Sequence, residues 1–371
     1  MQSGASRRLN GVSDNHEDSS IIAEKLRELS MSDITCLIPT HNRPFFLRRL
    51  LHFLEQTSAD FRLLIVDSSR PEFRSSNELL IAQMRRSLKI SYRHSDECFV
   101  TKCRQAIDSI ETPLTFCCAD DDFPIPTGVS ACAEFLRQNA DYTIAQGVKL
   151  SYSTTKGLYV LHGYDVDHDD AEQRFQQFAA HWFCTLFATC RTAALQHSFR
   201  ITDQATDYDR ARIFPELMWT QMGVLQGKLK HLQVAYNLRE EHQLNESTVV
   251  PEIADREHRT ELYEGFRNAI AGELSEFSGT TTNEALKTVD QCYGYLLAGR
   301  NRKDRSVSGR VRREGRRQWH RLLDMINREQ VLQRRRLKMA DPLCSDQACQ
   351  LALQLTQQYP LGIKDDAVAA A

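Results

Sequence analysis

Short apolar runs alternate with longer amphipathic stretches through the first 140 residues of the chain. Strands are expected at 34–38, 61–66, 90–93 and 114–119, and all of these except the short segment 90–93 are largely apolar. The stretches between them have a helical pattern, and they lie at 44–54, 77–87 and 101–110. Strands that alternate with helices form βαβ units. The pattern therefore predicts an α/β fold of Rossmann-like type, with a mainly parallel central sheet and flanking helices.

The pattern changes twice after residue 140. Further strands are expected at 142–145, 149–160 and 229–238, and helical pieces within 171–194 and at 213–226. From about residue 255 the periodicity is helical throughout, with basic clusters at 300–317 and 334–338. We therefore divide the chain into a polar tail with a short helix (1–31), an α/β domain (32–254) and a helical C-terminal extension (255–371).

Composition limits the class of protein. The chain has 371 residues, 41% of them hydrophobic, and a formal net charge of −2, which disfavours a nucleic-acid partner. Its 11 cysteines include no CxxC pair, so they indicate free thiols in a reducing compartment rather than a zinc site. No run approaches the roughly 18 apolar residues of a membrane span, and residues 1–20 have no hydrophobic signal-peptide core. We expect a cytoplasmic protein.

Polar side chains follow three of the predicted strands at the point where each strand ends. Thr40 follows the first strand, Asp67 the second, and the run Asp120–Asp122 the fourth. Ligands of parallel sheets bind beyond the carboxyl ends of the strands. Clustered carboxylates resist ionising together unless a cation neutralises them. Mg²⁺ or Mn²⁺ binds carboxylate oxygens and shares its other positions with phosphates, so the run predicts a metal that holds a phosphorylated ligand. The alternative is that these aspartates form a turn that leads into the helix near Thr127.

Three motifs carry a resemblance to a known family. They are CLIPTHNRP at 36–44, LIVDSS at 64–69 and CADDDF at 118–123. In this order they resemble the nucleotide-sugar glycosyltransferases of the GT-A fold, of the inverting family 2 type. The subgroup that the chain is most similar to is a bacterial set with a TIGR-type glycosyltransferase domain. The resemblance covers about residues 32 to 250 and leaves the region after 255 uncovered.

The resemblance implies a role for each matching residue. The donor nucleotide and its diphosphate would contact Pro39, Thr40, Arg43, Asp67, Asp120 and Asp121. A divalent metal, Mn²⁺ or Mg²⁺, would bind the DxD pair Asp120 and Asp122, with the downstream His242 completing the site. Because three aspartates are adjacent, the ligand pair could also be Asp121 and Asp122.

Two further assignments concern the acceptor side. The family has an acidic catalytic base near the start of a later helix; Glu216 is the best match, and Asp207 and Asp209 compete with it. The alternative for Glu216 is a first-turn acid that complements the helix dipole. His181 and Trp182 could form a platform for an acceptor sugar, whereas the alternative for Trp182 is packing in the core.

The resemblance implies an inverting, metal-dependent hexosyltransferase that uses a nucleotide sugar, most often UDP-linked, and a glycan or lipid-linked acceptor of surface polysaccharide assembly. One alternative is a sugar nucleotidyltransferase, although the loop at 39–43 lacks the glycines that cradle a triphosphate. Another is a catalytically silent nucleotide-sugar-binding module. The basic clusters after residue 300 indicate either a solvated helix face or peripheral contact with an anionic membrane surface.

Overall fold

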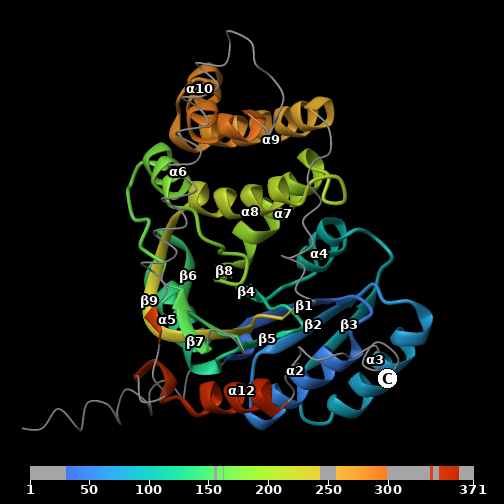
Figure 1. The fold of residues 1–371 in the computed structure, drawn as a ribbon. Coiled ribbons are helices and arrows are strands. Elements are labelled where there is room, and N and C mark those ends of the chain that lie inside the picture. The colour runs from blue at the N-terminus through green and yellow to red at the C-terminus, as the bar shows by residue number, and fades with distance from the viewer. Residues whose placement is uncertain are drawn as a thin grey trace, which may run out of the picture.

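This computed structural model describes residues 31–153, 157–161, 163–242, 256–298, 335–336 and 342–358. Its strands are β1 (Ile34–Thr40), β2 (Arg62–Asp67), β3 (Ile90–His94), β4 (Leu114–Cys117), β5 (Asp122–Pro124), β6 (Tyr142–Ser153), β7 (Gly157–Leu161), β8 (Thr189–Arg191), β9 (Lys228–Glu240) and β10 (Arg335–Arg336). Within the described residues they form one curled, ten-stranded sheet (Figure 1). The strand order is β10-β7-β6-β8-β4-β1-β2-β3, and β9 pairs with both β5 and β6.

The N-terminal half of the sheet is parallel. Strand β1 pairs in parallel with β2 and β4, and β2 pairs in parallel with β3. The helices that connect these strands are α2 (Pro44–Gln56), α3 (Pro71–Met84) and α4 (Phe99–Ile107). Proline stands in the first turn of α2 and α3, where its missing N–H and fixed φ suit a helix start. Helix α3 consequently begins at Pro71, six residues before the start that the apolar pattern predicts. The predicted α/β, Rossmann-like fold class is confirmed.

The C-terminal half of the sheet is mixed, and here one prediction was wrong. Residues 142–145 and 149–153 belong to the single strand β6, and a separate antiparallel strand, β7, begins only at Gly157. Gly147 does not end the strand. It lies where the pairing of β6 with β9 is irregular, and a Cβ there would approach Val234 O to 2.6 Å. The glycine thus marks a close approach of two strands rather than a break.

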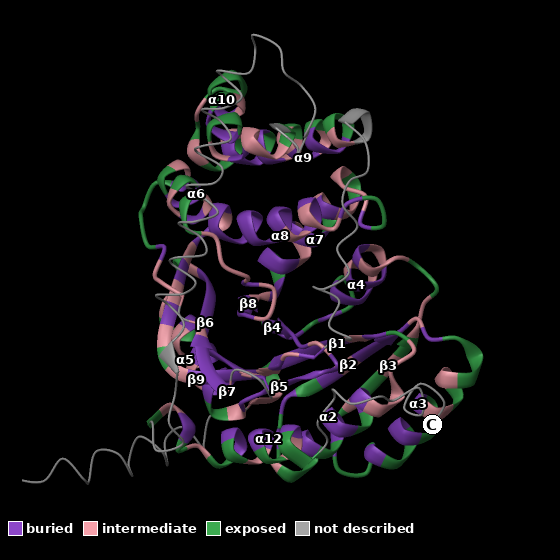
Figure 2. Cartoon of the chain, viewed as in Figure 1, coloured by how far each residue is buried: buried purple, intermediate pink, exposed green. Residues whose placement is uncertain are grey.

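Helices cover both faces of the sheet. The further helices are α5 (Pro126–Gln138), α6 (Ala171–Ala180), α7 (Thr192–Ala205), α8 (Ile213–Gln226), α9 (Arg256–Ser278), α10 (Thr282–Tyr293) and α12 (Gln347–Gln358), with short 3₁₀ turns at Met31–Asp33, Gly294–Ala298 and Pro342–Cys344. In the view of Figure 1, α2, α3 and α12 lie below the sheet, α4, α7 and α8 lie above it, and α9 and α10 are farthest from it. Most strands are largely buried, with β3 at the edge of the sheet as the exception, whereas the helices are buried mainly on the side that faces the sheet (Figure 2).

The core has three parts that follow these layers. The first lies between the sheet and α2, α5 and α12, and it includes Phe53, Phe123 and Leu353. The second lies between the other face of the sheet and α4, α7 and α8. The third joins α8 to α9 and α10 through aromatic side chains such as Phe214 and Phe266. The position of the predicted boundary at residue 255 stays a prediction.

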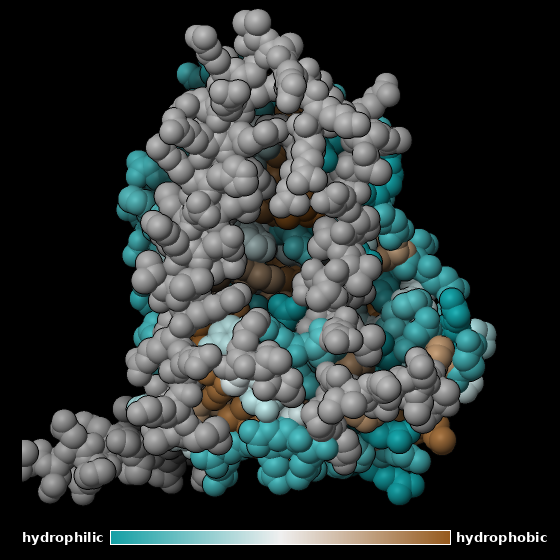
Figure 3. Space-filling model, viewed as in Figure 1, coloured by the Kyte–Doolittle hydropathy of each residue, from teal (hydrophilic) through white to brown (hydrophobic). Residues whose placement is uncertain are grey.

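Some expectations fall on parts of the chain that the structure does not describe. They are the polar tail and short helix before Met31 and the basic clusters at 300–317 and 334–338, apart from the two residues of β10. Among the described helices, none combines the length and the apolar character that crossing a membrane requires. Hydrophilic side chains cover much of the surface over α2 and α3 in the view of Figure 3, as expected for a face in contact with water.

Candidate functional site

The predicted polar residues meet at the carboxyl edge of the parallel strands. Thr40 is the last residue of β1, and it pairs with Asp67, the last residue of β2. After β4 the chain turns through Asp120 and Asp121, and Asp122 begins β5. All three aspartates are buried. The sheet therefore brings side chains that are up to 80 positions apart in the sequence to one rim, as the sequence predicts.

Arg43 joins two of the aspartates. Its Nη1 donates a hydrogen bond to Asp120 Oδ1 at 2.8 Å, and its Nη2 donates to Asp121 Oδ2 at 2.7 Å. Thr40 Oγ1 donates to the other oxygen of Asp120 at 2.7 Å. The guanidinium lies 4.3 Å from the ring centroid of Phe46, one turn further along the chain. Because Arg43 precedes α2 and the aspartates follow β4, this contact joins two loops of the rim through charge-assisted hydrogen bonds.

His242, which follows β9, also contacts the carboxylate of Asp121. Its Nε2 lies 3.1 Å from Asp121 Oδ2, and its ring stacks on Phe46 with 5.0 Å between centroids. Burial alone would raise the pKa of Asp121. The hydrogen bond from His242 and the charge of Arg43 outweigh burial and hold that pKa well below its ordinary value. Of the three aspartates, His242 contacts Asp121, which favours the alternative register of the DxD motif.

Asp122 has a different environment. It lies on β5 opposite Arg239 of β9, and its Oδ2 accepts a hydrogen bond from Asn237 at 3.4 Å. Burial, together with the neighbouring charge of Asp121, raises the pKa of Asp122 to about 7. The charges of Arg239 and Lys149 act in the opposite direction and are too weak to prevent this rise. The three adjacent aspartates are therefore chemically distinct.

Asp67 is enclosed by hydrogen-bond donors. Its Oδ1 accepts from the backbone N–H of Ser69 at 2.7 Å, and its Oδ2 accepts from Asn77 at 2.9 Å and from the Tyr92 hydroxyl at 3.1 Å. The side chain is fully buried. These bonds fix the turn after β2, and contact of Asp67 with a nucleotide stays a prediction.

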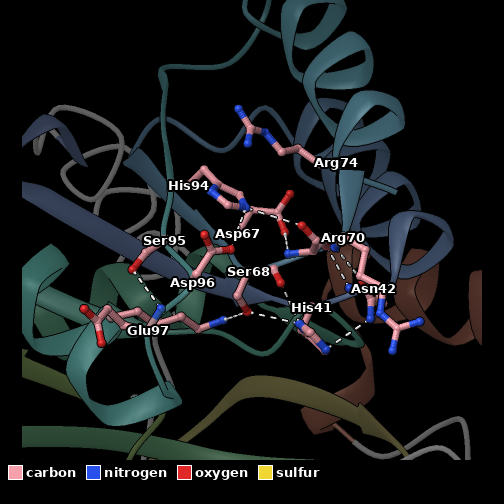
Figure 4. Close-up of polar contacts among 12 residues, drawn as sticks. His41, Asn42, Asp67, Ser68, Arg70, Arg74, His94, Ser95, Asp96 and Glu97 are labelled. Carbon is pink, nitrogen blue, oxygen red and sulfur yellow. Dashed lines mark hydrogen bonds and ion pairs between the residues drawn. The ribbon is translucent and has the colours of Figure 1, made fainter. Parts of the chain in front are cut away.

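The loops after β1, β2 and β3 are tied together beside Asp67 (Figure 4). His41 Nδ1 lies 2.8 Å from Ser68 O, and Asn42 Oδ1 accepts from the backbone N–H of Arg70 at 2.8 Å. Asn42 has a φ of 54°, a left-handed conformation that asparagine tolerates better than most residues. His94 Nε2 lies 3.3 Å from Ser69 O. The predicted nucleotide side of the site is thus built from three short polar loops.

The predicted acceptor-side residues lie in the helical layer. Glu216 is in the first turn of α8, where the family's base is expected. Its competitor Asp207 accepts from the backbone N–H groups of Asp209 and Arg210, which is a turn-forming role. Trp182 Nε1 donates to Thr220 Oγ1 at 2.9 Å, and its ring packs against the second and third parts of the core. His181 ends α6 and is exposed. Side chains that contact the aspartates include those of Thr40, Arg43, His242 and Asn237.

Sequence reasoning missed two sets of buried charges near the rim. Lys102 of α4 donates from Nζ to Thr40 O at 3.1 Å and to Ser68 Oγ at 2.7 Å. Arg49 of α2 forms a 2.6 Å ion pair with Glu240, and both side chains are almost fully buried. A signal for Arg49 existed, because it stands within the apolar stripe of α2, three residues after Phe46. Lys102 gives no comparable signal.

The donor atoms at the rim can be compared with the needs of a divalent metal. The carboxylate of Asp121 and the imidazole of His242 are suitable ligands for Mn²⁺, and Mg²⁺ often takes only one or two carboxylates and completes its shell with water and substrate phosphates. In the part of the chain that the structure describes, no group of three or more His, Cys, Asp or Glu is arranged to hold an ion. The residues fit a cation that shares its shell with phosphate, provided that Arg43 moves away from Asp121.

Comparison with known proteins adds little to this geometry. No protein-family model matches the chain. No curated protein matches it either. Among solved structures it is similar to S. aureus TarS, with 12% identity and a TM-score of 0.47 over 72% of this chain and 44% of that one. It is similar to S. aureus TarS 1-349 in complex with UDP-GlcNAc, with 14% identity and a TM-score of 0.45 over 71% of this chain and 70% of that one. The chain thus spans less than half of the longer TarS chain, and a likeness of this degree identifies no site.

Proposed function

We propose that the protein is a nucleotide-sugar glycosyltransferase whose donor diphosphate binds at the carboxyl rim of the parallel strands. The observation that supports this most directly is the convergence of Thr40, Arg43 and His242 on Asp120 and Asp121. A structural turn would need one or two hydrogen bonds. Here two cationic or cation-forming side chains and a hydroxyl from distant segments are gathered around carboxylates that the resemblance assigns to the donor.

Each residue of the rim has a task in this proposal. The loops at 41–43 and 68–70 bind the nucleoside, together with Pro39 and Asp67. Arg43 exchanges its bonds with Asp120 and Asp121 for the donor diphosphate, which attracts the guanidinium as a carboxylate does. Mn²⁺ or Mg²⁺, held by Asp121 and His242, would stabilise the negative charge that grows on the leaving diphosphate. The DxD assignment of Asp120 and Asp122 is the competing choice of ligands.

The acceptor half of the proposal rests on the resemblance. Glu216 would remove the proton from the acceptor hydroxyl as that hydroxyl attacks the anomeric carbon, and a single displacement by one base gives inversion. His181 and Trp182 would border the acceptor, a glycan or a lipid-linked glycan. The donor is expected to be UDP-linked. Contact of the basic clusters at 300–317 and 334–338 with an anionic membrane surface, from the cytoplasmic side, belongs to the same proposal.

The first test is calorimetric titration of the full chain with UDP, with and without Mn²⁺. We expect saturable UDP binding that Mn²⁺ strengthens at least tenfold. Asp121→Asn should lose this strengthening, because it removes a metal ligand while keeping the shape of the side chain. Asp60→Asn, a change of an exposed aspartate at the distant end of β2, serves as the matched control and should bind as the wild type does.

Two outcomes would contradict the proposal. The first is the absence of UDP binding by a folded wild-type protein. The second is binding of UDP to the Asp121→Asn variant with unchanged affinity and unchanged response to Mn²⁺. A panel of UDP-sugars, followed by release of UDP on addition of glycan acceptors, then separates transfer from simple binding. Glu216→Gln should retain UDP binding and lose transfer.

A further inference from the structure

A row of polar residues continues from the acidic rim across three neighbouring strands. Asp122 of β5 pairs with Arg239 of β9, which pairs in turn with Ser151 of β6. Two residues earlier on both strands, Asn237 of β9 pairs with Lys149 of β6. Paired residues share a face of the sheet, and so do residues two apart on one strand. These five residues therefore lie on one face.

The opposite face of these three strands is apolar, which agrees with the placement of the five polar residues on one face. Phe123, Leu238 and Leu150 occupy the intervening positions of the same three strands, and all three are in the first part of the core. Four of the five side chains in the polar row, those of Asp122, Asn237, Lys149 and Ser151, are buried and therefore require partners. Polar groups are rarely kept in buried positions without hydrogen bonds.

Lys149 has no such partner within the described structure. It is 9% exposed, and its Nζ lies 4.7 Å from the centroid of the Phe187 ring. Its charge also lowers the pKa of Asp122, although no hydrogen bond joins the two side chains in the described contacts. Phe187 belongs to the segment between α6 and β8. The residue is not completely enclosed, because 9% of its surface remains exposed. An ammonium carries three hydrogen-bond donors, and an aromatic ring satisfies none of them as an anion would.

The position of Lys149 indicates what it can reach. Strands are about 4.8 Å apart, so β6 lies roughly 10 Å beyond β5. A diphosphate at Asp120 and Asp121 would bind beside β4 and β5, whereas Lys149 stands two strands away from β5, on β6. The part of the substrate that extends past the diphosphate, which is the transferred sugar or the acceptor, can lie over β9 and β6. The charge of Arg239 acts on this face as well, because Arg239 and Lys149 both lower the pKa of Asp122.

We propose that Lys149, together with Arg239 and Ser151, forms a subsite for an oxyanion, a phosphate or a carboxylate, carried by the transferred sugar or by the acceptor. This inference rests on the proposed function in placing the donor diphosphate at the neighbouring rim. Lys149 supplies a compact positive charge on a stem that is held by the sheet and by Phe187. Neutral sugars are disfavoured in this subsite because their hydroxyl groups leave the buried charge without a counter-ion.

The test compares the wild type with Lys149→Met, which keeps the stem and removes the charge. Lys89→Met, at an exposed lysine, is the control. Calorimetry is run with UDP, UDP-glucose and UDP-glucuronic acid, and then with inorganic phosphate added to UDP-loaded protein. We expect UDP to bind both variants as it binds the wild type. If the oxyanion is on the sugar, Lys149→Met weakens UDP-glucuronic acid at least tenfold and leaves UDP-glucose unchanged. If it is on the acceptor, Lys149→Met loses the binding of phosphate to the UDP-loaded protein.

A second measurement does not depend on the variant. Acetylation of lysines in the wild type, read by mass spectrometry, should slow at least fivefold at Lys149 when phosphate or UDP-glucuronic acid is added, and it should not change at Lys89. Lys149→Arg should keep oxyanion binding within threefold.

The proposal is overturned if Lys149→Met weakens UDP itself tenfold, because Lys149 then belongs to the diphosphate site. It is also overturned if no oxyanion probe distinguishes the variants and none slows acetylation of Lys149. Failure of the wild type to bind UDP would instead count against the proposed function. Protection of Lys149 by phosphate in the same protein would still support the subsite.

Discussion

Removal of Arg43 is the most informative perturbation of the rim. Arg43→Gln takes away the charge that lies between Asp120 and Asp121 and leaves the polarity of the position. In the variant, Thr40 still donates to Asp120 and His242 still contacts Asp121, but the charge between the two carboxylates is gone. Arg48→Gln, an exposed arginine on the same helix, is the matched control.

The magnitude follows from the burial of the three side chains. Breaking a fully buried ion pair by removing one partner costs about 3–5 kcal/mol. The aspartate side chains are 2% and 7% exposed, but Arg43 is 21% exposed, so water screens part of the interaction. We therefore expect a loss of about 2–3 kcal/mol in the free energy of unfolding. With an unfolding entropy of about 2.1 cal/mol/K per residue, each kcal/mol lowers Tm by about 1.3 °C in a chain of 371 residues, which predicts a fall of about 3–4 °C for Arg43→Gln.

The assay is thermal and urea denaturation in EDTA, followed by titration with Mn²⁺. Because the variant frees Asp121 and His242, it should bind Mn²⁺ in the absence of nucleotide more tightly than the wild type. At a Mn²⁺ concentration 100 times the dissociation constant, binding adds about 2.7 kcal/mol. The metal should therefore restore most of the lost stability in Arg43→Gln and change little in the wild type or in Arg48→Gln.

The pH dependence of the same variant has a definite sign. Arg43 helps to depress the pKa of Asp121 in the folded state, so its contribution to stability is present above the unfolded pKa of about 3.9 and is lost as the pH falls below it. The difference in stability between the wild type and Arg43→Gln should narrow below about pH 4. A smaller part of it should already be lost as the pH falls through about 7, because Arg43 also lowers the pKa of Asp122, and this interaction ends when Asp122 is protonated. Equal stability of the two proteins in EDTA at pH 7, or an equal response to Mn²⁺, would refute this account of the rim.

Three further changes have outcomes that the structure predicts. Asp122→Asn should raise Tm at pH 8 and have little effect at pH 4.5, because the pKa of about 7 means that ionisation of this buried acid destabilises the fold as the pH rises from about 4 to 7. Gly128→Ala should destabilise the protein by about 1–3 kcal/mol or more, because the new Cβ would lie 2.0 Å from a backbone atom of β9. Gly272→Ala is the control: its Cβ meets no neighbour, so the change should stabilise the helix by up to about 1 kcal/mol. Urea denaturation measures both effects. Glu240→Gln should cost about 3–5 kcal/mol in the same assay by leaving Arg49 unpaired, and a double change of both residues to leucine should recover much of it.

The parallel half of the fold could be predicted because its signals are local. Strands β1, β2 and β4 are short, largely apolar runs, and Pro44 and Pro71 mark helix starts. The mixed half could not be predicted in the same way. The three residues of β8 are too few to form a periodic pattern, yet they pair with both β4 and β6 and so join the two halves of the sheet. Such a pairing is decided by which backbones are left without hydrogen bonds once the larger elements have packed.

The candidate site likewise combines a motif that can be found in the sequence with contacts that only the fold creates. The sequence cannot tell the three adjacent aspartates apart, since each has the same charge and nearly the same neighbours. The structure separates them through partners that lie far away: Thr40 and Arg43 for Asp120, Arg43 and His242 for Asp121, and Asn237 for Asp122. Their pKa values then diverge, falling for Asp121 and rising for Asp122. The motif alone could locate the carboxylates, but the choice of which one receives a cation depends on the geometry of residues 77 to 121 positions away. Substitutions of Arg43 and His242 should therefore distinguish the possible registers of the motif more clearly than substitutions of the aspartates themselves.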